Sequence, residues 1–201
     1  MRVIAIMSSG NSNKFGAIIE HFKNTPDIKI VCISDNLRSD IFTLTKPEFV
    51  ETKYLSPEAA QSYFMNNTFD LIAINGYQSK LDTGIYTLGK FINLHQSLLP
   101  AFKGDNALYR AFESGVKVSG ITIHTLTGNN DTEKILAQYP ILISALTHFD
   151  EFEKMTNTLT DLLYPIVIEK TLQNKLFDFQ DLYDKHKSCS GNCSGGCGGC
   201  H

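Results

Sequence analysis

Short apolar runs alternate with amphipathic stretches along the first half of the chain. Residues 3–7, 28–34 and 71–75 are mostly apolar, and each is predicted to form a buried strand. Residues 14–23 and 57–66 lie between these runs and have the spacing of amphipathic helices. Strands that alternate with helices pair in parallel through right-handed crossovers. The pattern therefore predicts an α/β fold, with a mostly parallel sheet flanked by helices.

The second half contains further elements of both kinds. Residues 107–113 are predicted to form a helix that closes at Gly115, and residues 118–126 alternate as a strand does. Residues 152–173 are predicted to form a long helix, and Pro165 is expected to kink it or to end its first half. The apolar run 70–77 reaches Gly76, and ligands commonly meet the carboxyl ends of such strands.

An amide and an imidazole stand two residues apart at the end of the apolar run 91–95. Residues i and i+2 of a strand point the same way, so Asn93 and His95 are expected to project together into one site. An amide donor beside a histidine is suited to stabilising a carbonyl oxygen as negative charge develops on it. The alternative is that this polar pair only satisfies backbone groups at a strand end.

Composition limits the class of protein. The 201 residues are 42% hydrophobic and 19% charged, which suits one soluble globular domain. The net charge of −3 predicts no general attraction for nucleic acid or acidic membranes. No stretch has the apolar length of a membrane span, and the N-terminus lacks the apolar run of a signal peptide. A cytoplasmic enzyme is the resulting expectation.

The composition changes after Lys187, so residues 1–187 are predicted to be the folded domain and residues 188–201 a flexible tail. The tail has the spacing C-x3-C-x3-C-x2-C followed by a histidine. Its candidate ligands for zinc, copper or an iron–sulfur centre are Cys189, Cys193, Cys197, Cys200 and His201. The alternative is a reduced, disordered tail or one with adventitious disulfides.

The segment Asn-Leu-His-Gln-Ser-Leu-Leu-Pro at residues 93–100 resembles the Asn-x-His-x-Ser-Leu-Leu-Pro motif of the folate-dependent formyltransferases. Residues 8–13, 101–104, 113–124 and 131–138 resemble further segments of that family, in the family's order. The resemblance implies a single Rossmann-like domain that transfers a formyl group from 10-formyltetrahydrofolate, its co-substrate, to a primary amine. The small-molecule acceptor expected first is glycinamide ribonucleotide of purine synthesis, and the enzyme is expected to be a monomer or homodimer.

The resemblance also implies roles for individual residues. The catalytic residues would be Asn93, His95 and Asp131, with the Asp131 carboxylate raising the pKa of His95. His124 is either a further participant or a core histidine. The acceptor phosphate would be held by Asn11, Ser12 and Asn13, with Gly10 allowing the turn, although these residues also suit capping of the next helix. The folate would contact Gln78, Ser79, Lys80, Leu81 and Asn93.

Several positions depart from the family pattern. Thr132-Glu133-Lys134 replaces a loop shaped by glycine and proline, and Ser79 replaces an arginine. The family pattern also has an acidic residue that binds the amine substrate, and its position here is occupied by Thr160, beside Asp161. These departures leave two alternatives open. One is a formyltransferase that acts on another small amine, such as an amino sugar. The other is a binding or metal-handling protein on a degenerate formyltransferase fold.

Overall fold

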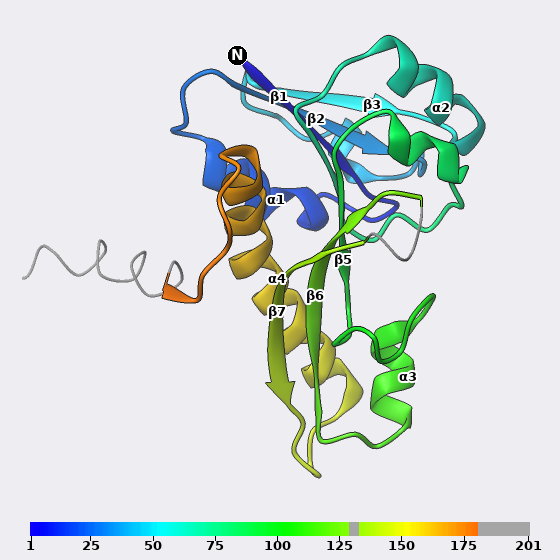
Figure 1. Cartoon of the computed structure of the whole chain (residues 1–201), viewed down its shortest axis with the longest axis vertical. Coiled ribbons are helices and arrows are strands. Elements are labelled where there is room, and N and C mark those ends of the chain that lie inside the picture. The colour runs from blue at the N-terminus through cyan, green and yellow to red at the C-terminus, as the bar shows by residue number, and fades with distance from the viewer. Residues whose placement is uncertain (129–132, 181–201) are drawn as a thin grey trace, which may run out of the picture.

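The computed structural model describes residues 1–128 and 133–180. Seven strands of these residues form one sheet in the order β3-β2-β1-β4-β5-β6-β7 (Figure 1). The strands are β1 (Arg2–Met7), β2 (Ile28–Ser34), β3 (Val50–Tyr54), β4 (Leu71–Ile74), β5 (Phe91–His95), β6 (Val118–Leu126) and β7 (Ile135–Leu142). Strands β1 to β5 pair in parallel, whereas β6 and β7 add as antiparallel strands. The predicted α/β fold with a mostly parallel sheet is confirmed.

Among the described residues, three α-helices lie between strands, α1 (Asn13–Phe22), α2 (Pro57–Asn66) and α3 (Ala107–Glu113), and a fourth, α4 (Phe149–Leu172), follows β7. Two short 3-10 helices, η1 (Asp40–Phe42) and η2 (Thr83–Thr87), complete the order. The bounds of β2, α2, α3 and β6 agree with the prediction. Strands β3 and β7 were not predicted because both are edge strands, and their sequences lack a clear apolar pattern. Strand β7 even contains Pro140, which a sheet tolerates at its edge.

The central strands are apolar on both faces because helices cover both faces of the sheet. Ile4 and Ile6 of β1 pack in one core cluster with side chains of α1 and α4. Ala5 and Met7, which alternate with them, pack in a second cluster with side chains of α2 and η2. The result is a three-layer arrangement, in which α1 and α4 lie together on one side of the sheet (Figure 1).

Helix α4 runs continuously through Pro165, so the expectation that Pro165 ends its first half is wrong. The preceding residue, Tyr164, is 1% exposed, and its hydroxyl donates to the carbonyl of Ile74 at 2.8 Å. The same hydroxyl lies 3.3 Å from the carbonyl of Ile92. These contacts tie the helix to the last residue of β4 and to the beginning of β5, and this packing outweighs the helical hydrogen bond that proline removes. Across the described ranges, no helix is both long and apolar enough to span a membrane.

Candidate active site

The polar pair of β5 projects from the α2 side of the sheet. Ile92 and Leu94 pack in the cluster with α1 and α4, so the residues between and after them face the opposite way. Asn93 and His95 therefore share one face, as predicted from their spacing. In the antiparallel pairing of β5 with β6, Asn93 lies directly opposite His124. Directly opposed side chains of an antiparallel pair are in contact range, so the fold brings these three polar residues together.

His124 fixes the orientation of the Asn93 amide. His124 is 7% exposed, and burial lowers the pKa of its imidazole, which favours the neutral form. Its Nδ1 lies 3.1 Å from the carbonyl of Thr125, which can only accept, so Nδ1 carries the hydrogen. Nε2 then accepts from Asn93 Nδ2 at 3.3 Å. The second N–H of the amide remains for a substrate oxygen. His124 is thus a positioning residue as well as a buried one.

A carboxylate stands beside this pair in the loop that departs from the family pattern. Glu133 Oε2 lies 3.6 Å from His124 Nδ1. Burial raises the pKa of Glu133, while Lys103 lowers it. Because burial lowers the pKa of His124 and favours its neutral form, this contact is not an ion pair at neutral pH.

His95 is held by a backbone carbonyl. Its Nε2 lies 3.0 Å from the carbonyl of Phe102, so Nε2 carries a hydrogen and Nδ1 is left to exchange a proton. Burial is the largest cause that lowers the pKa of His95; the bond to Phe102 raises it, and His124 and Arg110 lower it. The expected raised pKa therefore does not arise from the described residues. Asp131, the proposed cause, lies outside them.

Arg110 of α3 organises the loop that carries this carbonyl. Its Nη2 donates to Phe102 O at 3.0 Å and also to Lys103 O, and its Nε donates to Asp105 O at 3.0 Å. Phe102 has a positive φ of 53°, which is uncommon for a residue with a side chain. One guanidinium that donates to three carbonyls stabilises such a turn. The sequence alone gave no signal for this role.

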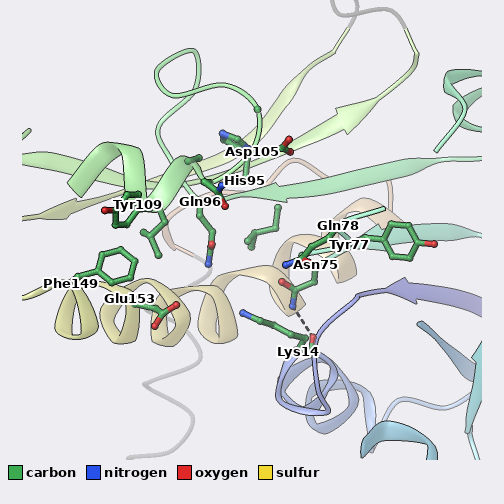
Figure 2. Close-up of a pocket in the computed structure, with 16 residues that line it drawn as sticks. Lys14, Asn75, Tyr77, Gln78, His95, Gln96, Asp105, Tyr109, Phe149 and Glu153 are labelled. Atoms are coloured by element: carbon green, nitrogen blue, oxygen red, sulfur yellow. Dashed lines mark hydrogen bonds between the residues drawn. The ribbon is translucent and has the colours of Figure 1, made fainter. Parts of the chain in front are cut away.

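Two cavities meet at His95. The first, of about 530 Å³, is lined by Lys14, Asn75, Gln96 and Glu153 among others (Figure 2). The second, of about 490 Å³, is lined by Asn93, His124, Lys103 and Glu133 among others. His95 lines both, together with Gly76, Tyr77, Leu94, Gly104 and Asp105. His95 and these five residues form the boundary that the two cavities share.

The predicted phosphate loop joins β1 to α1, as expected, and Asn11 and Asn13 are exposed there. The donors of Ser12, however, already have an anionic partner. Its N–H donates to Asp40 Oδ1 at 2.6 Å and its hydroxyl donates to Asp40 Oδ2 at 2.9 Å. The carbonyl of Gly10 accepts from Ser39 Oγ at 2.9 Å. A phosphate that binds Ser12 must therefore displace the Asp40 carboxylate.

The predicted folate segment is divided among several environments. Gln78 lines the first cavity, and Ser79 donates a hydrogen bond to Asp35. Lys80 and Leu81 line a smaller cavity of about 280 Å³ beside α2 and η2. Only Asn93 of the proposed folate residues lines the second cavity in the described part of the chain. The preceding Tyr77 lines both large cavities.

Helix α4 presents a different acid to the first cavity from the one expected. Thr160 is 3% exposed, and Asp161 is exposed, but neither lines the two large cavities. Glu153, two turns earlier on the helix, lines the first cavity. Sequence reasoning missed Glu153, Lys14 and Asn75. Of these, Asn75 had a visible signal, since it is a polar residue at the end of an apolar strand.

Asp131 and the tail residues Cys189, Cys193, Cys197, Cys200 and His201 lie outside the described residues. Within the described ranges, no group of three or more histidine, cysteine, aspartate or glutamate side chains is arranged to hold a metal ion. Cys32 is a free, buried thiol, and burial raises its pKa to about 12. It is therefore an unreactive core side chain.

Known proteins resemble this chain in sequence and in fold. The family model for formyl transferase matches residues 1–169 of the chain. The chain therefore belongs to the formyl transferase family. Among its relatives is the phosphoribosylglycinamide formyltransferase of Bacillus subtilis (strain 168), with 32% identity over 187 residues, 86% of this chain and 95% of that protein.

Solved structures share the fold. Glycinamide ribonucleotide transformylase 1 from Geobacillus kaustophilus is 26% identical and superposes with a TM-score of 0.76, covering 86% of this chain and 99% of that chain. The corresponding protein from Symbiobacterium toebii has a TM-score of 0.78 at 23% identity, covering 89% of this chain and 91% of that chain. The second likeness supports the fold alone.

Proposed function

We propose that the protein transfers a formyl group from 10-formyltetrahydrofolate to the amine of glycinamide ribonucleotide. The observation that carries the proposal is the position of His95 where two cavities meet, with Asn93 beside it. Two substrates that exchange a group need such a junction. The relative from Bacillus subtilis, similar over nearly its whole length, bears the name of this activity and supports the choice of acceptor.

The chemistry follows from the hydrogen-bonding groups. The neutral acceptor amine attacks the formyl carbon, a C–N bond forms, and the carbonyl oxygen becomes an oxyanion. The free N–H of Asn93 donates to that oxyanion. His95 Nδ1 takes the proton that the attacking nitrogen loses, and the resulting imidazolium stabilises the intermediate. The bond from the formyl carbon to N10 of the folate then breaks, and N10 receives the proton. Asp131 is proposed to stabilise the imidazolium.

Formyl transfer to glycinamide ribonucleotide, followed by the absorbance change of the folate, tests this proposal. His95→Ala and Asn93→Ala are each expected to lower kcat about 100- to 1000-fold, as loss of a general base or an oxyanion donor does. His21→Asn is the matched control, because it removes another largely buried histidine that lines neither large cavity. Wild-type protein that is folded but transfers no formyl group would remove the assignment.

A second candidate acceptor is an amino sugar or another small amine. This alternative is favoured by the uncharged Thr160, which stands where the family pattern has the acidic residue that binds the amine substrate. Competition between glycinamide ribonucleotide and a panel of amino sugars distinguishes the two. A higher kcat/KM for an amino sugar would transfer the assignment to that substrate, with the same catalytic residues.

For the tail we propose metal binding by the four cysteines and His201, supported by their close spacing. Elemental analysis of the reduced full-length protein is expected to find about one metal site per chain. A variant of the full chain with all four tail cysteines changed to serine is expected to lose the metal. Equal metal content in both proteins would refute this role. Metal uptake without any effect of His95→Ala on activity would favour a metal-handling protein instead.

A further inference from the structure

The loop between β5 and α3 presents three carbonyl groups to one side chain. Arg110, on α3, donates from Nε to the carbonyl of Asp105 at 3.0 Å. Its Nη2 donates to the carbonyl of Phe102 at 3.0 Å and also to that of Lys103. The Phe102 carbonyl has a second donor, His95 Nε2, at 3.0 Å. One carbonyl oxygen therefore joins the guanidinium of Arg110 to the imidazole of His95.

The backbone of this loop has an unfavourable conformation. Phe102 and Asn106 have φ values of 53° and 52°, and Gly104 lies between them at 82°. Such a conformation is uncommon for a residue with a side chain and persists where the surroundings fix it. Arg110 contacts the carbonyls on both sides of Gly104, and its planar fork has donors at fixed angles, which a lysine ammonium lacks. The guanidinium is therefore suited to hold this loop, including the Phe102 carbonyl, in place.

The bond to that carbonyl decides which imidazole nitrogen of His95 can act as a base. A carbonyl oxygen only accepts, so Nε2 keeps its hydrogen and the lone pair is on Nδ1. His95 lines both large cavities, where the substrates of a transfer reaction would meet. If the Phe102 carbonyl moved, the imidazole would lose both its orientation and its preference for this tautomer.

Arg110 also acts on His95 through its charge, because a nearby cation disfavours the imidazolium. Burial is the largest cause that lowers the pKa of His95, and His124 and Arg110 lower it further, against the bond to Phe102. Arg110 is exposed, so salt screens its charge. The other charged side chains and the other histidine that line the two cavities are Lys14, Lys103, Asp105, His124, Glu133 and Glu153. All of these are kept when Arg110 is replaced.

We propose that Arg110 is a positioning residue for the formyl transfer. It acts through the Phe102 carbonyl, which holds the imidazole of His95 with Nδ1 free, and its charge keeps that nitrogen ready to accept the proton of the attacking amine. This inference rests on the proposed function, in which His95 is the base. It adds that an exposed residue of α3 controls when that base is available.

NMR titration of the free, full-length protein tests the inference without turnover. The ring signals of His95 are identified by their loss in His95→Ala. Arg110→Gln removes the charge and is expected to raise the pH at which His95 is half-protonated, whereas Arg110→Lys keeps the charge and is expected to titrate near the wild-type pH. Added salt is expected to raise this pH more in the wild type than in Arg110→Gln, because it screens the charge that the variant lacks.

The transfer assay separates positioning from a purely structural role. Both variants lose the planar fork, so each is expected to lower kcat about 10- to 100-fold, as a misplaced catalytic group does. In the pH profile of kcat/KM, the acid limb of Arg110→Gln is expected to move to higher pH and that of Arg110→Lys to stay in place. A purely structural role would lower Tm in both variants and move neither limb.

Arg2→Gln is the matched control, because Arg2 is the first residue of β1 and lines neither large cavity. The inference is overturned if Arg110→Gln titrates as the wild type does or if Arg2→Gln raises the half-protonation pH of His95 equally. It is also overturned if Arg110→Lys titrates as Arg110→Gln does or keeps the wild-type kcat. Wild-type protein that transfers no formyl group would remove the proposed function, and the titration would still show whether Arg110 controls the protonation of His95.

Discussion

Replacing Thr122 by valine should destabilise the loop that follows His95, although Thr122 lines neither of the two large cavities. Thr122, on β6, is fully buried, and its hydroxyl donates to the carbonyl of Ser97 at 2.7 Å. The same oxygen accepts from the N–H of Leu99 at 3.0 Å and from Gln138 Nε2 at 3.0 Å. These contacts hold the residues that directly follow His95.

Valine has nearly the shape of threonine but offers no hydrogen bond. The carbonyl of Ser97 and the N–H of Leu99 would lose a partner in a buried environment, and each such loss costs about 1–3 kcal/mol. Gln138 Nε2 keeps its second acceptor, the carbonyl of Leu99 at 2.8 Å, so its loss is smaller. We expect Thr122→Val to lower the free energy of unfolding by about 2–6 kcal/mol. Tm should fall by about 4–24 °C.

Urea unfolding and formyl transfer measure the two consequences. Thr122→Ser is the matched control, because it keeps the hydroxyl and removes one buried methyl, at a cost of about 1 kcal/mol. At a temperature where both variants are folded, kcat of Thr122→Val is expected to be the lower of the two, since the loop positions His95. Equal stability of the valine and serine variants would refute the reasoning.

Three further predictions follow from other parts of the molecule. Asp40→Asn is expected to lower the dissociation constant for inorganic phosphate, because it removes the carboxylate that competes for the phosphate loop; an unchanged constant would contradict this. Gly120→Ala is expected to unfold at lower urea than the wild type, since an added Cβ would lie 2.0 Å from a carbonyl oxygen of β7. Burial lowers the pKa of His95 and His124, so the unfolded chain binds more protons just below about pH 6.5, and the free energy of unfolding should fall there as pH drops. Urea titrations at about pH 7 and about pH 5.5 check this, and equal values at both would disprove it.

The sequence by itself determined the parallel core and the common side of the proposed catalytic pair, Asn93 and His95. The continuous apolar runs of β1, β2 and β4 indicate strands covered on both faces, and this is a property of local pattern. The spacing of Asn93 and His95 fixes their common side, because side chains of a strand alternate strictly. The motif around them also indicated the family, which the comparison confirms.

Only the tertiary structure decided which distant residues join that pair. His124 contacts Asn93 because β5 and β6 run antiparallel in one particular register, and no local pattern encodes that register. Glu153 lines the first cavity, whereas the expected Thr160 does not, because the packing of α4 sets the helix rotation. Asp40 reaches the predicted phosphate loop from a separate segment, 28 residues away from Ser12 in the chain. Local sequence determines which side of a strand or helix a residue occupies, whereas long-range packing determines what that side meets.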